Sequence, residues 1–233
     1  ISFIMRMENL EYPAAIEFLA DRAGIRLPEN GTVTKNGVNR IRIKEMNREA
    51  AKFFHEQLLR SPGAMAYLTE RGLSSAAVKR FGLGFSPDEP CALYSYMRNR
   101  GYNDNELVAG FLCGISKRSG KPYDYFRGRI IFPVIDTAGA VVAFGGRVMD
   151  GSLPKYLNTS DTPAFQKRKN LFALNFAKNH CTEGFILCEG YMDVIALHEA
   201  GFGQAVATLG TAITPEQARI MRRYTDKVLI SYD

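Results

Sequence analysis

The chain has 233 residues, of which 46% are hydrophobic and 23% are charged. This length and composition suit one large or two smaller globular domains. The formal net charge of +6 weakly favours a polyanionic partner. It has no run of 18 apolar residues, and its mixed N-terminal sequence lacks the pattern of a secretory signal, so no membrane-spanning helix and no export signal are expected. Cys91, Cys113, Cys181 and Cys188 form no CxxC pair, which argues against a zinc site within the chain and fits a reducing cytoplasm.

The first half of the chain is expected to be mostly helical, because apolar residues recur there at helical spacing. The polar segment 30–40, which holds two glycines, is typical of a linker. Ser74 is the expected N-cap of one helix, and Gly72 and Gly82 stand where glycines follow helix ends. The predicted helices lie within residues 1–27 and over Met46–Arg60, Ala64–Arg71 and Ser74–Phe81, with a further pair within 93–112.

Strand signals follow this helical part. Two runs rich in β-branched and apolar residues, Arg129–Ile135 and Val141–Phe144, flank a turn at 137–139 and predict a hairpin. The segment Leu153–Lys169 contains two prolines and a basic triplet and is expected to be irregular, and Asn170–Asn179 is expected to form a short helix.

The last 50 residues alternate between strands and helices. The order strand, helix, strand, helix, strand requires a parallel sheet with right-handed crossovers. Thr214, Pro215 and Gln217 form a capping-box sequence at the start of the second helix. The expected elements are strand 185–190, helix 191–201, strand 204–210, helix 214–224 and strand 227–233.

Basic residues are concentrated in one part of the chain. Between Lys117 and Lys169 there are ten Lys or Arg residues and four Asp, so this segment alone has a net charge of +6. Such a segment is either a surface for a polyanion or an ordinary solvated basic face, and its charge alone does not decide between the two.

Two acids follow predicted parallel strands. Glu189 ends the first strand and Asp233 the third, and the carboxyl ends of parallel strands face one crevice, where ligands bind. Carboxylates there are suitable ligands for a hard cation such as Mg²⁺, or they only favour the N-terminus of the next helix. Asp193, one turn into that helix, is either a supporting residue or a plain surface acid.

Longer segments carry a family resemblance. CEGYMDVIAL, ATLGTAITPEQ and VLISYD resemble the toprim domain of bacterial DnaG-type primases, in which a strand-end glutamate precedes a glycine and a later strand ends in an Asp-x-Asp pair. Glu189–Gly190 matches the first feature, and Asp233 matches the first aspartate of the second. ERGLSSAAVKRFGLGFSP, RGRIIFPVIDTAGAVVAFGGRV and PKYLNTSDTPAFQKRKNLFAL are similar to the primase core, and ISFIMRMENLEYPAAIEFLA is similar to the end of the family's zinc-binding domain.

The resemblance implies an α/β fold in several parts. Residues 1–27 would be the tail of the zinc-binding domain, 28–44 a linker, 45–182 the basic α+β N-terminal subdomain of the catalytic core, and 183–233 a truncated toprim-like parallel βαβαβ sheet. The zinc ligands would precede Ile1, so Zn²⁺ is expected only in the parent protein.

The implied activity is that of a DNA primase, an RNA polymerase that makes short primers on single-stranded DNA from NTPs with two Mg²⁺ or Mn²⁺ ions. Glu189 and Asp233 would be the catalytic metal ligands. The glycines before Arg147 are expected to let a phosphate approach the backbone, and Lys155 is expected in an irregular loop. The residues expected to contact nucleic acid or NTP are Arg147, Lys155, Lys167, Asn158, Tyr156, Arg127, Arg129 and Arg71. Tyr123, Tyr125 and Phe126 either stack on bases or belong to the hydrophobic core, and the core is the favoured interpretation.

The resemblance further implies a monomeric cytoplasmic protein that binds template, RNA primer and NTPs, with a replicative helicase engaged through a C-terminal domain outside this chain. The 233-residue piece itself is expected to bind DNA weakly and not to polymerise. Two alternatives remain open: another toprim enzyme, such as a topoisomerase or nuclease, and a non-catalytic module that binds single-stranded nucleic acid with its basic face.

Overall fold

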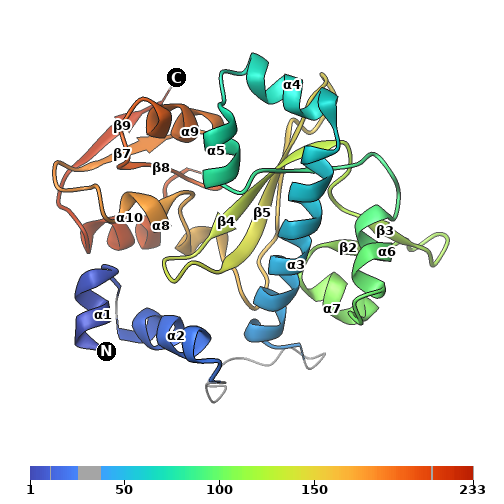
Figure 1. The fold of residues 1–233 in the computed structure, drawn as a ribbon, viewed down its shortest axis with the longest axis horizontal. Helices are drawn as coiled ribbons and strands as arrows, with labels where there is room; N and C mark the ends of the chain where they lie inside the picture. The colour runs from blue at the N-terminus through green and yellow to red at the C-terminus, as the bar shows by residue number, and fades with distance from the viewer. Residues whose placement is uncertain (11, 26–37, 211, 233) are drawn as a thin grey trace. The chain divides into compact units, whose positions relative to one another are not determined.

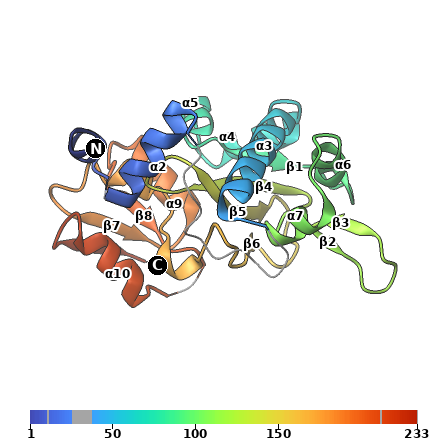
Figure 2. The same ribbon diagram turned by 90° about the horizontal axis from the view of Figure 1, so that it is seen from below.

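The computed structural model describes all residues except 11, 26–37, 211 and 233 and divides the chain into two compact units (Figure 1, Figure 2). The first unit comprises the described residues within Ile1–Gly31, Ile135–Ala140 and Arg168–Asp233, and the second those within Thr32–Val134 and Val141–Lys167. In the part of the chain described, no helix is both long enough and apolar enough to cross a membrane.

The second unit contains a four-stranded sheet with the order β1–β4–β5–β6. Strand β1 runs antiparallel to β4, and β5 runs antiparallel to β6. The expected hairpin joins β4 to β5, and the Asp136 carboxylate closes its turn by accepting hydrogen bonds from the N–H groups of Ala138 and Ala140. The four strands are β1 (Gly84–Ser86), β4 (Arg129–Ile135), β5 (Val141–Val148) and β6 (Tyr156–Asn158).

One long helix, α3 (Arg40–Leu59), packs on this sheet. Asn39 caps its N-terminus by accepting a hydrogen bond from the Arg42 N–H at 2.8 Å. The helix lies so close to β1 that a Cβ atom added to Gly84 would be 2.5 Å from the Cβ of Phe54. Phe54 in turn meets Phe126 and Phe144 edge to face in the centre of the core, so three aromatic rings fill the space between helix and sheet.

Shorter elements complete the second unit. Ser74 caps α5 as predicted, and Gly72 and Gly82 adopt positive φ after their helices. The short helices are α4 (Pro62–Glu70), α5 (Ser75–Arg80), α6 (Ala92–Arg98) and α7 (Asp104–Ala109), and a separate two-stranded sheet pairs β2 (Cys113–Ile115) with β3 (Pro122–Asp124).

The first unit contains the predicted parallel sheet, whose strand order is β8–β7–β9. Its core includes Phe185 and Leu187 from the central strand, Val206 from β8 and Met221 from α10. Its elements are α1 (Ser2–Met7), α2 (Tyr12–Ala23), α8 (Leu174–Ala177), β7 (Phe185–Cys188), α9 (Tyr191–Glu199), β8 (Ala205–Ala207), α10 (Pro215–Arg222) and β9 (Val228–Ser231). A 3₁₀ turn, η1 (Lys167–Lys169), spans the boundary of the two units.

The predicted α/β class, with helices and an antiparallel sheet followed by a parallel βαβαβ sheet, is confirmed. The capping box at Thr214 is also confirmed, because the side chains of Thr214 and Gln217 each bond to the backbone N–H of the other. The domain limits 1–27, 28–44, 45–182 and 183–233 stay a prediction, and the linker lies largely outside the described residues.

Several element boundaries differ from those predicted. Helix α3 begins at Arg40 rather than Met46, because the Asn39 cap is followed by helical turns that the polar sequence did not indicate. The helix predicted at 170–179 shrinks to four residues, because Phe172 pairs as a bridge with Ala207 and Ala173 has a φ of 63°. Strands β1, β2, β3 and β6 were not predicted, since each has only three residues.

We expect Gly84→Ala to lower the free energy of unfolding by about 1–3 kcal/mol, because the added Cβ would overlap the backbone and Cβ of Phe54. Gly63→Ala is the matched control, since no heavy atom lies within 4 Å of its Cβ position and alanine favours helix α4 by up to about 1 kcal/mol. Urea denaturation followed by circular dichroism measures both. Equal midpoints for the two variants would contradict the close approach of α3 and β1.

Candidate functional site

Glu189 lies at the carboxyl end of the parallel sheet, as predicted. Strand β7 ends at Cys188, which is in register with Ser231 on β9, so the residues that follow the two strands emerge at the same edge. Glu189 is exposed directly after the central strand. Its carboxylate is therefore accessible to a ligand at the sheet edge.

Asp193 has a structural task next to this carboxylate. Its side chain accepts a hydrogen bond from the Gly190 N–H at 3.1 Å and so caps helix α9. This contact favours the simpler of its two interpretations, an acid on the first turn of the helix.

Tyr232 is the last described residue at this edge. Burial, and then the nearby Glu189 carboxylate, raise the pKa of the Tyr232 hydroxyl. The second predicted metal ligand, Asp233, lies outside the described residues. Among those described, no group of three His, Cys, Asp or Glu side chains is arranged to hold a metal ion. The exposed oxygen atoms of Glu189 suit a hard divalent cation as a single carboxylate donor.

In the second unit, Arg147 and Tyr156 lie opposite each other on β5 and β6. An Arg147 Nη1 atom donates to the Tyr156 hydroxyl at 2.7 Å, and the guanidinium lies 5.3 Å from the Tyr156 ring centroid. Arg147 is only 7% exposed, and its buried Nε has no hydrogen-bond partner among the described residues. Tyr156 thus fixes the Arg147 guanidinium, and the Nε–H of Arg147 remains without an acceptor among the described residues.

Arg129 is oriented inward rather than toward solvent. Its residue is 8% exposed, and its Nη1 donates to the carbonyl groups of Pro154 (3.0 Å), Lys155 (3.4 Å) and Gly146 (3.5 Å). Burial lowers the pKa of this guanidinium. Arg129 therefore fastens the loop before β6, and its expected contact with nucleic acid stays a prediction.

The residues around β6 are more ordered than predicted. PKYLN was expected to be an irregular loop, but Tyr156–Asn158 forms an edge strand in which Asn158 is paired with Gly145. The strand is defined by its pairing with β5 at the edge of the sheet, and its three residues alone did not indicate a strand. The Lys155 side chain is exposed just before this strand, while its carbonyl accepts hydrogen bonds from Val148 and Arg129.

The glycines before Arg147 have a different role from the one expected. Gly145 and Gly146 are buried in β5, and a Cβ on Gly146 would lie 2.7 Å from Cδ1 of Phe126. The missing side chain makes room for a core ring. That a phosphate approaches the backbone there stays a prediction.

The other predicted contacts are spread over the second unit. Lys167 is half-buried at the start of η1, and its backbone N–H donates to the Asp161 carboxylate at 2.9 Å. Arg127 is exposed after β3. Arg71 is exposed at the end of α4, where its guanidinium lies 5.4 Å from the Tyr67 ring centroid. Arg71 thus belongs to a helix and not to the β5–β6 surface that bears Arg147, Lys155 and Tyr156.

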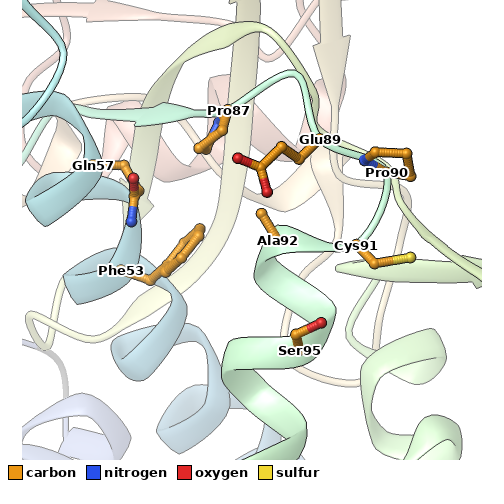
Figure 3. A pocket seen from close by; sticks show the side chains of 8 residues that line it. All are labelled: Phe53, Gln57, Pro87, Glu89, Pro90, Cys91, Ala92 and Ser95. Atoms are coloured by element: carbon orange, nitrogen blue, oxygen red, sulfur yellow. The ribbon is translucent and has the colours of Figure 1, made fainter.

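A cavity of about 510 Å³ in the second unit contains none of the predicted contacts (Figure 3). Glu89 is the one charged residue in its lining, and Figure 3 shows its carboxylate directed toward the interior above the Phe53 ring. A carboxylate in an otherwise uncharged cavity repels polyanions, so this cavity is unsuited to a template or triphosphate. Its lining comprises Phe53, Gln57, Pro87, Glu89, Pro90, Cys91, Ala92 and Ser95.

Two family models match the chain. Residues 53–178, more than half of the chain, match the DNA primase catalytic core, N-terminal domain, and residues 186–233 match a Toprim-like family. The chain belongs to the DNA primase catalytic core family. The resemblance found in the sequence is thereby confirmed.

Known primases are similar over the whole chain. The DNA primase of Clostridium acetobutylicum is 42% identical over all of this chain, which covers 39% of that protein. The crystal structure of the RNA polymerase domain of Mycobacterium tuberculosis primase DnaG has a TM-score of 0.77 at 33% identity, covering 84% of this chain and 67% of that one. A structure of the DnaG primase catalytic domain bound to ssDNA has a TM-score of 0.74 at 33% identity, covering 82% and 63%. The chain spans about two fifths of the length of the curated primases it matches.

In this primase-family chain, we expect Arg129→Met to destabilise the second unit by about 1–3 kcal/mol and to loosen the loop before β6, because the carbonyls of Gly146, Pro154 and Lys155 each lose the Arg129 donor. Hydrogen exchange at residues 149–155 and urea denaturation measure the two effects. Arg127→Met is the matched control, with the same charge change at an exposed position. Equal exchange in both variants would show that Arg129 does not hold the loop.

Proposed function

We propose that the protein carrying this chain is a DNA primase, which copies single-stranded DNA into short RNA primers by nucleotidyl transfer. The observation that supports this most directly is the place of Glu189, an exposed carboxylate directly after the central strand of a parallel sheet, in a chain of the primase catalytic core family. A polymerase of this kind needs carboxylates for metal ions and cations for template and triphosphate.

Glu189 is proposed as one metal ligand and Asp233 as a second, with Mg²⁺ or Mn²⁺ as the ion. Bound metal would lower the energy of the attacking oxygen and of the pyrophosphate that leaves. Glu189 contributes oxygen atoms at a position set by the backbone of β7, so little of its placement depends on side-chain contacts.

Arg147, Lys155 and Lys167 are proposed as contacts to the phosphates of template, primer or NTP. The unpartnered Nε of Arg147 supports its place in this set, because a buried donor without an acceptor costs free energy that a phosphate oxygen would recover. Tyr156 holds the Arg147 guanidinium in a fixed orientation, and Asn158 follows on the same edge strand. Arg127 and Arg71 are exposed cations that would add longer-range attraction.

The remaining parts of the proposal concern the whole protein. We infer a monomeric, cytoplasmic primase with single-stranded DNA, RNA primer and NTPs as its partners and a replicative helicase bound through a C-terminal domain. Zn²⁺ is proposed for a domain that precedes this chain. The structure of a DnaG primase catalytic domain bound to ssDNA, which is 33% identical to this chain, supports single-stranded DNA as a partner.

Glu189→Gln in the whole protein is expected to lower primer synthesis at least about 100-fold, because an amide is a poor substitute for a carboxylate metal ligand. Incorporation of labelled NTPs on a single-stranded template measures the loss. Glu183→Gln is the matched control, since Glu183 is an exposed acid just before β7. Full activity of Glu189→Gln would exclude the proposed ligand role, and nicking or relaxation of DNA without NTP incorporation would favour another toprim enzyme.

If Arg147, Lys155 and Lys167 contact phosphate, each alanine variant should reduce the log–log salt slope of single-strand binding by about 0.7. Fluorescence anisotropy with a labelled oligonucleotide at several salt concentrations gives the slope. Lys79→Ala is the control, because Lys79 is an exposed cation in the last turn of α5. Slopes equal to that of the parent in all three variants would remove these residues from the interface.

A further inference from the structure

The β2–β3 hairpin of the second unit carries a cluster of exposed cations. Lys117, Arg118 and Lys121 are all exposed in its loop, and residues 115–123 include no acid. The hairpin belongs to a two-stranded sheet separate from the one that bears Arg147, and it extends beyond α6 and α7 (Figure 2). The sequence showed these cations only as part of a broad basic segment, because the turn between two three-residue strands was not recognised.

An aromatic ring covers part of the backbone of this hairpin. Tyr123 on β3 is paired with Gly114 on β2, and a Cβ added to Gly114 would lie 2.6 Å from Cζ and 2.7 Å from the hydroxyl oxygen of Tyr123. The ring therefore covers the Gly114 backbone in the space that any other residue would fill. Tyr123 is 36% exposed, so part of the ring remains open to solvent. Such a ring is suited to stack against a nucleobase.

Neighbouring aromatic rings hold Tyr123 in place. Tyr125 meets it edge-on, with centroids 5.4 Å apart and planes at 79°, and Phe111 stacks on Tyr125 at 4.2 Å and 8°. Phe111 has a φ of 55°, a conformation that is costly for a non-glycine residue. In this conformation its ring stacks on Tyr125. The row of three rings is thus preorganised. Phe126, in contrast, is fully buried in the core, as predicted.

The base of the hairpin is anchored to α6 by a buried carboxylate. Asp124 on β3 accepts hydrogen bonds from the N–H groups of Leu93 (2.7 Å) and Tyr94 (2.9 Å) at the start of that helix. The thiol of Cys113, its partner on β2, donates to the same carboxylate. Cations and aromatic ring are therefore presented on a fixed support rather than on a free loop.

We propose that this hairpin is a second nucleic-acid contact, with Lys117, Arg118 and Lys121 on phosphates and Tyr123 stacked on an unpaired base of a single strand. Three cations without an acid complement a phosphate backbone, and a partly exposed aromatic ring can stack on a base that is not already stacked in a duplex. An acidic protein segment would use the cations but has no need of the ring. The inference that the bound single-stranded nucleic acid is a primase template rests on the proposed function, whereas the inference that the hairpin binds single-stranded nucleic acid does not.

The test uses the full 233-residue chain and two labelled 20-nucleotide probes, oligo-dT and an abasic strand with the same phosphates, and measures affinity by fluorescence anisotropy. Replacing Lys117, Arg118 and Lys121 together by alanine should reduce the log–log salt slope by about 2, at about 0.7 per contact, for both probes. Arg60→Ala is the charge control, since Arg60 is exposed at the far end of α3.

The ring is tested separately from the charge. Tyr123→Ala should weaken oligo-dT binding by about tenfold and abolish its preference over the abasic strand, whereas Tyr123→Phe should keep the preference. Gly114→Ala should resemble Tyr123→Ala, because the added Cβ displaces the ring while every charge remains. Circular dichroism of each variant verifies the fold, and Tyr123→Phe serves as the well-folded comparison.

The outcomes separate this proposal from the proposed function. An unchanged slope in the triple variant, or an equal preference for oligo-dT in Tyr123→Ala and Tyr123→Phe, overturns the hairpin contact. Displacement of oligo-dT by polyglutamate at equal charge concentration also overturns it, in favour of an acidic protein partner. None of these results depends on Glu189, whose role is decided by NTP incorporation alone.

Discussion

The buried guanidinium of Arg129 is the contact on which the proposed phosphate surface of the second unit depends. It donates to carbonyl groups on β5 and on the loop before β6, so an edge strand of only three residues is fixed to the sheet at its start. The same strand pair places Tyr156 opposite Arg147, and Lys155 is exposed directly before it. The buried Arg129 guanidinium thus holds the loop from which Lys155 projects, because a carbonyl that loses its donor on folding is costly.

Missing side chains are used in the same unit to place aromatic rings. Gly84 admits α3 against β1 next to Phe54, and Gly146 makes room for the Phe126 ring in the core. Gly114 does the same on the β2–β3 hairpin, but there the ring is partly open to solvent. Glycines thus allow close packing inside the unit and a preorganised, partly exposed ring on its surface. Preorganisation matters for binding because less side-chain freedom is lost when a ligand arrives.

In the first unit, backbone register has the equivalent role. The parallel pairing of β7 with β9 fixes which residues emerge at the carboxyl edge of the sheet, and Glu189 is exposed there without a specific side-chain support. The sequence did not decide the role of Asp193, and in the structure its carboxylate accepts a hydrogen bond from the Gly190 N–H at the N-terminus of α9. The strand register alone explains the position of Glu189, whereas membership in the primase catalytic core family is the reason for proposing it as a metal ligand.

The sequence by itself determined the α/β class, the order of the parallel βαβαβ segment, the capping box at Thr214 and the strand-end position of Glu189, because these follow from local periodicity and capping chemistry. Family membership was also evident from long contiguous segments. Only the tertiary structure decided that Arg129 is internal, that Gly146 serves the core, and that Lys117 and Tyr123 share a hairpin. Each of these depends on contacts between residues distant in sequence or on the pairing of the short strands β2 and β3, which lie outside the alternating strand–helix pattern that indicated β8.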